Sequence, residues 1–127
     1  MEKIIIDTSF LVALLNANDN LHSKAKEAFF ERKISKIQLY DYIYSETLTV
    51  LRYKAPEHQC ESFLRFIAGF QMEIYLSNQK KYSLATQYFH KHKKLSFVDC
   101  LIIATAKLEN ATILTFDKQL QKAFKLS

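Results

Sequence analysis

The sequence has only one glycine, one proline and two cysteines in 127 residues. A single glycine cannot build the glycine-rich phosphate turn of a dinucleotide-binding fold. Cys60 and Cys100 lie far apart, outside any Cys-x-x-Cys or Cys/His pair, so we expect two buried, reduced thiols and neither a zinc site nor a disulfide framework. A long uncharged apolar run is missing too, so we predict no signal peptide or membrane span and expect a cytoplasmic protein without a membrane partner.

Repeats, linkers and low-complexity segments are also missing, so we expect residues 1–127 to form one domain of common size. The net charge is +5, from 18 basic and 13 acidic residues. No acid falls between Glu73 and Asp99, where seven lysines and histidines gather: Lys80, Lys81, His90, Lys91, His92, Lys93 and Lys94. Such a stretch attracts polyanions such as nucleic acid. Its alternative interpretation is a solvated helix face, which is the commoner role of lysines.

Short apolar runs alternate with helical patterns along the chain. We predict strands at about 3–7, 36–39, 73–76 and 112–115. Helices are predicted at about 8–16, 21–32, 42–54, 56–69, 81–90 and 97–108, and from residue 118 onward. Three consecutive isoleucines, residues 4–6, indicate a central parallel strand that is buried on both faces. The alternation predicts an α/β fold, with a central, mostly parallel sheet of four to five short strands flanked by helices.

One predicted helix is bounded by the two rarest residues of the chain. Pro56 is expected to open it and Gly69 to end it. Its apolar residues are expected on one side: Cys60, Phe63, Leu64 and Ile67.

Three aspartates stand where a packed α/β domain has little use for a carboxylate. Asp7 ends the first predicted strand, Asp117 follows the last one, and Asp99 leads an otherwise apolar helix. Because ligands bind beyond the carboxyl ends of parallel strands, we expect these carboxylates to gather at one edge of the sheet. Each aspartate could instead be a helix N-cap, and Ser96 to Asp99 resembles a capping box. The apolar helix behind Asp99 favours a carboxylate that needs a partner.

Glu46 occupies a helical position that the pattern reserves for an apolar side chain. It shares one face with Ile43, Val50 and Tyr53 at spacings of three and four residues. Its alternative interpretation is a glutamate at the margin of the stripe, with its stem packed and its head in water.

Four carboxylates in one site would need counter-charge. Two of them about 4 Å apart repel by roughly 4 kcal/mol at an effective dielectric constant near 20. Divalent metal supplies that charge without raising the carboxyl pKa values far above normal. A set of oxygen ligands without histidine or cysteine favours Mg²⁺ or Mn²⁺ over zinc. The chemistry that fits is metal-assisted phosphodiester hydrolysis.

The order of these motifs resembles that of PIN domains, particularly the VapC-like toxins of type II toxin–antitoxin modules. The similarity spans essentially the whole chain and rests on four segments: Asp7-Thr8-Ser9; Ser45-Glu46; Leu95-Ser96-Phe97-Val98-Asp99 with Ala104-Thr105-Ala106; and Thr115-Phe116-Asp117. The chain departs from the family in lacking glycine near the last two segments, where Asn110 can end the helix in the left-handed conformation.

The resemblance implies a three-layer PIN-like fold and an endoribonuclease that needs Mg²⁺ or Mn²⁺. It implies that the catalytic and metal-binding residues are Asp7, Glu46, Asp99 and Asp117. It also implies supporting hydroxyls at Thr8, Ser9 and Thr115, an RNA substrate, a homodimer and a cognate antitoxin. We expect lysines near the groove to hold the RNA backbone: Lys91, Lys93 and Lys94.

Two other classes of protein are alternatives, and the sequence speaks against the first. An enzyme with an aspartyl nucleophile would need a second acid two residues after Asp7, where Ser9 stands. The stronger alternative is a catalytically inactive PIN-like module that binds RNA or protein, and metal binding would distinguish it from the ribonuclease.

Overall fold

The computed structural model describes residues 2–32, 34–54 and 58–127. The four strands in that part of the chain are β1 (Glu2–Ile6), β2 (Ile34–Tyr40), β3 (Ile74–Tyr75) and β4 (Thr112–Leu114). Its helices are α1 (Thr8–Leu15), α2 (His22–Phe30), α3 (Asp41–Lys54), α4 (Gln59–Gly69), α5 (Gln79–Lys91), α6 (Phe97–Glu109) and α7 (Lys118–Leu126). The strands form one parallel sheet in the order β3-β2-β1-β4. The predicted α/β class and parallel sheet are confirmed.

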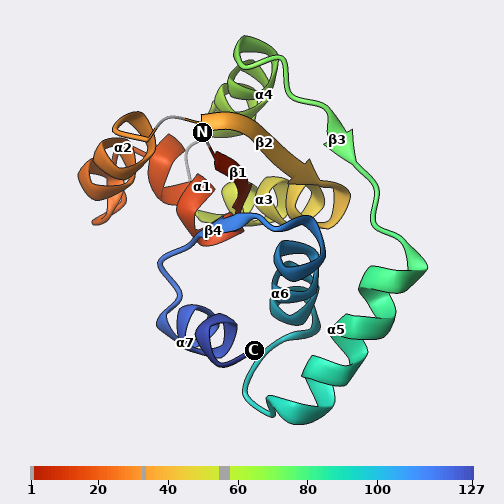
Figure 1. The fold of residues 1–127 in the computed structure, drawn as a ribbon. Coiled ribbons are helices and arrows are strands. Elements are labelled where there is room, and N and C mark those ends of the chain that lie inside the picture. Colours follow the sequence, from red (N-terminus) through yellow and green to blue (C-terminus); the bar gives the residue numbers. More distant parts are fainter. Residues whose placement is uncertain (1, 33, 55–57) are drawn as a thin grey trace.

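The sheet lies between two groups of helices. In Figure 1, α1, α2 and α4 lie on one side of it and α5, α6 and α7 on the other, and residue contacts within each group agree. The inner strand β1 pairs with β2 on one side and β4 on the other. This order puts the first strand of the chain at the centre of a three-layer domain.

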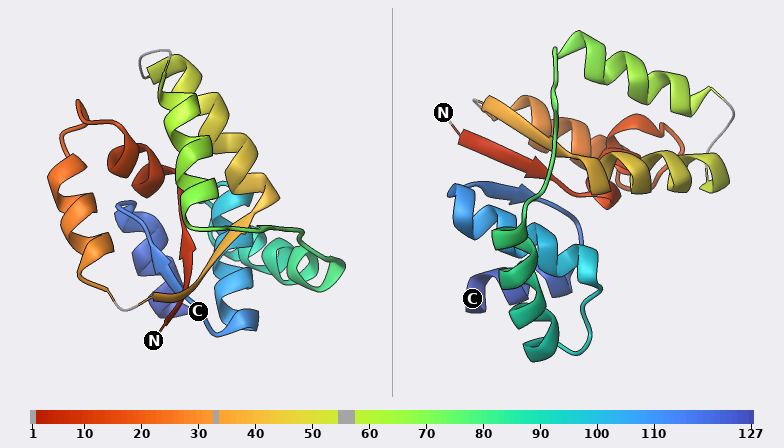
Figure 2. Two further views of the ribbon diagram at one scale, coloured as in Figure 1. Left: turned by 90° about the horizontal axis from the view of Figure 1, so that it is seen from above. Right: turned by 90° about the vertical axis from the view of Figure 1, so that its right-hand side faces the viewer.

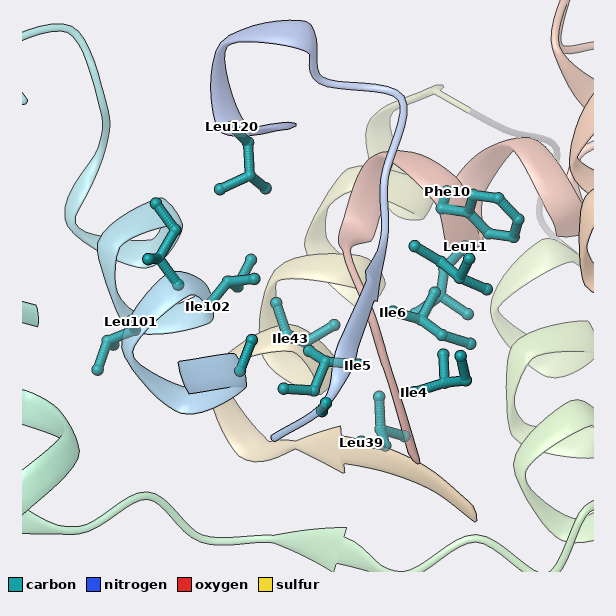
Figure 3. Close-up of a cluster of buried hydrophobic side chains, with 14 of the residues drawn as sticks. Ile4, Ile5, Ile6, Phe10, Leu11, Leu39, Ile43, Leu101, Ile102 and Leu120 are labelled. Carbon is teal, nitrogen blue, oxygen red and sulfur yellow. The ribbon is translucent and has the colours of Figure 1, made fainter. Parts of the chain in front are cut away.

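The three isoleucines of β1 pack against both helical layers. Ile4, Ile5 and Ile6 are at most 2% exposed. Figure 3 shows Ile4 and Ile6 on the side of α1, whereas Ile5 points to the opposite side, toward Ile43 and Ile102. Successive side chains of a strand point to opposite faces, so an unbroken apolar run suits a strand that is covered on both.

The carboxyl ends of the strands meet at one edge of the sheet. In the right-hand view of Figure 2, β1, β2 and β4 point toward the same side of the molecule. The backbone N–H of Asp7 donates to the carbonyl oxygen of Leu114 at 2.9 Å, which extends the β1–β4 pairing by one residue. The segments that follow β1 and β4 therefore start side by side.

Helix α6 has strong signals at both ends, and both were readable in the sequence. Ser96 and Asp99 form the predicted capping box at its start. Asn110 ends it with φ 52° and ψ 50°, which confirms the expected left-handed residue. Every residue from Cys100 to Ala106 is buried. The start of this apolar helix is therefore fixed relative to the core.

Several local expectations differ from the structure. Leu64 is 47% exposed and Tyr53 is 82% exposed, although both were expected on buried stripes. Phe63 lies on the face of α4 that packs inward. Leu64 is the next residue, so its side chain is rotated by about 100° around the helix axis and points away from the core. Cys60 is only half-buried, whereas Cys100 is buried as expected, and both are free thiols.

The two residues expected to bound α4 have different outcomes. Gly69 is the last residue of α4, as predicted, but the left-handed conformation falls on Gln71, with φ 52°. Pro56 lies outside the described residues. In the part of the chain that the structure describes, no helix is both long and apolar enough to cross a membrane.

Replacement of Ile5 should test the role of β1. Ile5→Ala removes a fully buried side chain from the centre of the sheet, so we expect the free energy of unfolding to fall by about 2–5 kcal/mol. Urea denaturation measures this quantity. Leu76→Ala is the control, because Leu76 is 74% exposed, and we expect a change within about 0.5 kcal/mol. Equal effects of the two substitutions would contradict the central role of β1.

Candidate active site

A pocket of about 360 Å³ is lined by all four of the predicted acids. Asp7 follows β1, Glu46 lies in α3, Asp99 lies in the first turn of α6, and Asp117 precedes α7. Thr8 and Ser9 line the same pocket. The fold thus brings together carboxylates from four separate segments, which we call the acidic pocket.

Asp7 is held on both of its carboxylate oxygens. Oδ1 accepts a hydrogen bond from the backbone N–H of Thr8 at 2.8 Å. Oδ2 accepts from the hydroxyls of Ser9 at 2.9 Å and Thr115 at 2.8 Å. Ser9 and Thr115 therefore hold the Asp7 carboxylate with their hydroxyls. Thr8 contacts Asp7 through its amide, and its hydroxyl accepts a hydrogen bond from Thr47 at 3.3 Å.

Thr115 connects Asp7 to Asp117. Its Oγ1 donates to Asp7 and accepts from the backbone N–H of Asp117 at 3.0 Å. The Asp117 carboxylate in turn caps α7, accepting from the amides of Gln119 at 2.9 Å and Leu120 at 3.1 Å. One hydroxyl therefore fixes the spacing between the first and the last acid of the site.

The pKa of the Asp99 carboxyl is affected by the negative charge of the other aspartates. Partial burial raises the pKa of its carboxyl, and repulsion from Asp117 and Asp7 raises it further. Hydrogen bonds with Ser96 act in the opposite direction. In the capping box, the Ser96 amide donates to Asp99 Oδ2 at 3.2 Å, and the Asp99 amide donates to Ser96 Oγ at 3.1 Å. Asp99 therefore caps α6 and also lines the pocket that contains Asp7 and Asp117.

Two further charged residues line the acidic pocket and were missed in the sequence. Lys54 continues the stripe of Glu46 and Val50 at spacings of four residues, and this periodicity could have revealed it. Asp19 lies between α1 and α2 and accepts a hydrogen bond from the amide of Leu21 at 2.8 Å. No periodic signal marks a residue in such a connection. Among the described residues that line the pocket, five carboxylates face one lysine.

The donor set suits a hard divalent cation, although its side chains do not converge in the structure. Carboxylate oxygens are the ligands that Mg²⁺ and Mn²⁺ prefer. Within the described ranges, no three Asp, Glu, His or Cys side chains form a ready metal-binding group. Three of the carboxylates, those of Asp7, Asp99 and Asp117, accept hydrogen bonds from backbone amides at the starts of α1, α6 and α7, which orients them toward these amides. An ionised carboxylate offers about four lone-pair sites, so a capping carboxylate keeps acceptor capacity for an ion.

The predicted RNA-binding lysines lie outside the acidic pocket. Lys91, Lys93 and Lys94 line an adjoining pocket with residues of α7. Lys81, which belongs to the same basic stretch, is buried, because its Nζ donates to the Tyr40 hydroxyl at 2.9 Å and lies 3.6 Å from Glu109 Oε1. Lys81 is therefore a packed residue and does not contribute to a basic surface.

Comparison with known proteins identifies the family. The PIN domain family model matches residues 4–125, so the chain belongs to the PIN domain family. None of the curated proteins matches it significantly. Among solved structures it is similar to VapC20 of Mycobacterium tuberculosis, a "Sarcin-Ricin loop cleaving toxin", with 21% identity and a TM-score of 0.83 over 94% of each chain.

Two solved complexes have the same fold. FitAcB from Neisseria gonorrhoeae matches with 17% identity and a TM-score of 0.69, over 96% of this chain and 93% of that one. VapBC2 from Rickettsia felis, bound to a promoter DNA fragment, matches with 18% identity and a TM-score of 0.67, over 94% and 92%. At these identities the likeness shows the fold alone, and function must be argued from the site.

The coupling between aspartates can be measured by NMR. In the metal-free protein we expect Asp117→Asn to lower the pKa of the Asp99 carboxyl, because it removes one repelling charge and keeps a side chain that can cap α7. Glu61→Gln on α4 should leave that pKa unchanged. If Asp117→Asn leaves the pKa of Asp99 unchanged, the charges of the two residues do not interact.

The same shift predicts a pH dependence of stability. The folded-state pKa of Asp99 lies above its ordinary value, so the folded state binds the proton more tightly than the unfolded state. This contribution to stability is complete below the unfolded-state pKa and is lost as pH rises through the higher folded-state pKa. In the metal-free protein, the stability of the wild type relative to Asp99→Asn should therefore fall over that pH range.

Proposed function

We propose that this PIN domain is a divalent-metal-dependent endoribonuclease and the toxin of a toxin–antitoxin pair. The observation that carries the proposal is that Asp7, Glu46, Asp99 and Asp117 line one pocket at the carboxyl edge of the sheet. A helix cap explains the position of three of them singly, but no cap explains Glu46. A shared cation explains why the fold gathers all four.

The roles of the residues follow from their surroundings. Asp7 and Asp99 would hold the ion, and Ser9 and Thr115 keep Asp7 in one orientation. Glu46 and Asp117 would complete the coordination or orient the attacking water. A bound Mg²⁺ or Mn²⁺ supplies positive charge that stabilises the phosphate in the transition state and lowers the pKa of water.

An antitoxin suits the same pocket. Its acids would attract a cationic side chain, and Val12, Leu21, Val50 and Phe116 offer apolar surface beside them. Phe116 is supported from behind by Phe10, with parallel rings 5.0 Å apart. Similar solved structures include a toxin–antitoxin complex from Klebsiella pneumoniae, which supports such a partner. Homodimerisation is part of this proposal, and sedimentation of the purified chain tests it.

The second candidate function is a PIN module that binds RNA or protein without cleaving RNA. The observation that favours it is the lack of convergence among the carboxylates within the described residues. Metal binding separates the two candidates. The ribonuclease needs a cation in the acidic pocket, whereas the module does not.

A nuclease assay tests the proposed activity. Purified protein should cleave single-stranded RNA in Mn²⁺ or Mg²⁺ and stop when EDTA is added. Because they remove a proposed metal ligand, Asp99→Asn and Glu46→Gln should each lower the cleavage rate by about 100-fold or more. Glu61→Gln is the matched control, since Glu61 is exposed on α4, outside the acidic pocket. Full activity of correctly folded Asp99→Asn would falsify the assignment.

Thermal unfolding in Mn²⁺ tests the metal site independently of cleavage. A ligand present at 100 times its dissociation constant stabilises the folded state by about 2.7 kcal/mol, so Mn²⁺ should raise the melting temperature of the wild type. The double variant Asp7→Asn/Asp99→Asn should not respond to Mn²⁺. If Mn²⁺ does not raise the melting temperature of the wild type either, the result favours the binding module.

A further inference from the structure

A second pocket, of about 370 Å³, lies between the α5–α6 connection and α7. The described residues that line it include no acid. Its lysines are Lys91, Lys93, Lys94 and Lys122. We call it the lysine pocket. Figure 1 shows its two walls, the α5–α6 connection and α7, at the same end of the molecule.

The lysine pocket adjoins the acidic pocket. Leu95 lines the lysine pocket and Asp99, four residues further on, lines the acidic one. At the start of α7, Asp117 lines the acidic pocket and Gln119 lines the lysine pocket. Residues at the starts of α6 and α7 thus line the two pockets.

Helix-end electrostatics explain only part of the lysine pocket. Lys91 lies in the last turn of α5, where a cation is favoured by the helix dipole. Lys122 belongs to α7, yet it faces the same hollow. Within the described part of the chain, none of the four lysines forms an ion pair. Their charge is therefore available to a ligand.

A buried polar atom in the same place also lacks a partner. His92 lines the lysine pocket, and its Nε2 is buried without a hydrogen-bond partner among the described residues. Buried nitrogen atoms are normally hydrogen-bonded, so this atom has capacity for a ligand oxygen. Lysine ammonium groups and an imidazole nitrogen are suitable partners for phosphate oxygens.

The charge of the acidic pocket creates the need for such a site. Without a bound cation, five carboxylates and one lysine repel a phosphodiester, so positive charge outside the acidic pocket would favour the entry of an RNA strand. Lys122 follows Asp117 by five residues, a rise of roughly 8 Å along the helix, which is the span of two to three stacked nucleotides at about 3.4 Å each. One strand can therefore contact both pockets.

We propose that the lysine pocket binds backbone phosphates of the RNA strand whose scissile bond lies in the acidic pocket. This inference rests on the proposed ribonuclease function. The lysines act on binding and orientation only, because the reacting phosphate lies in the neighbouring pocket. They contribute affinity regardless of base sequence.

Binding of a fluorescent 12-nucleotide single-stranded RNA, measured by anisotropy in EDTA over a range of KCl concentrations, tests the proposal. We compare the pocket variant Lys93→Gln/Lys94→Gln/Lys122→Gln with a control variant, Lys3→Gln/Lys24→Gln/Lys26→Gln. The two variants lose the same charge, all six lysines are exposed, and the control residues line neither pocket. The comparison separates a local site from a general effect of net charge.

We expect a large loss of affinity in the pocket variant alone. Each phosphate contact contributes about 0.7 to the slope of log K against log salt for single strands, so three lysines account for about 2 units of slope and about 100-fold in affinity near 0.1 M salt. Lys93→Arg/Lys94→Arg/Lys122→Arg should retain binding. In the cleavage assay the pocket variant should raise KM and leave kcat unchanged.

The outcomes distinguish this proposal from the proposed function. If the wild type cleaves RNA but the pocket and control variants lose affinity equally, the lysine pocket is not a phosphate site. The same holds if the pocket variant loses kcat without a change in KM. If the wild type neither binds nor cleaves RNA, both proposals are wrong.

Discussion

The structure depends on the burial of the three isoleucines of β1. Its three isoleucines contact helices on both faces of the sheet, so the strand can occupy only the central position. Because β1 lies beside β4 and the amide of Asp7 bonds to Leu114, the residues after both strands start at the same level. The Thr115 hydroxyl then donates a hydrogen bond to the Asp7 carboxylate and accepts one from the backbone N–H of Asp117. Hydrophobic burial in the sheet thus determines where the polar edge forms.

Helix capping and site formation use the same carboxylates. Asp7, Asp99 and Asp117 each accept a hydrogen bond from a backbone amide at or near the start of a helix. These bonds stabilise negative charge on each residue. At Asp99, partial burial and, as a smaller effect, repulsion from Asp117 and Asp7 oppose that charge and raise the pKa of the carboxyl. The balance leaves three ionisable groups that are fixed in place and close enough to repel. A divalent cation would relieve that repulsion, which is the physical ground for the proposed metal site.

Much of the fold and the acidic site could be predicted from the sequence, because their signals are local. The isoleucine run, the Ser96 capping box and Asn110 each define structure within a few residues. Other features depend on tertiary contacts that no local pattern carries. Lys81 belongs to a basic stretch but is buried by Tyr40 and Glu109, which are distant in sequence. Leu64 and Tyr53 fit apolar stripes, but both side chains are exposed in the described part of the chain. Asp19 reaches the pocket from an irregular connection.

Helix α6 has a fixed length, and this limits how the chain can change over evolution. Ser96 determines where it starts and Asn110 where it stops, and all residues between Cys100 and Ala106 are buried. An insertion or deletion of one residue within it would rotate everything on one side by about 100° relative to the other. Asp99 would then turn away from Asp7, or the buried face would turn into solvent. The fold can tolerate single substitutions in this helix but not changes of its length. Insertions in relatives should therefore occur in the connections between helices and strands.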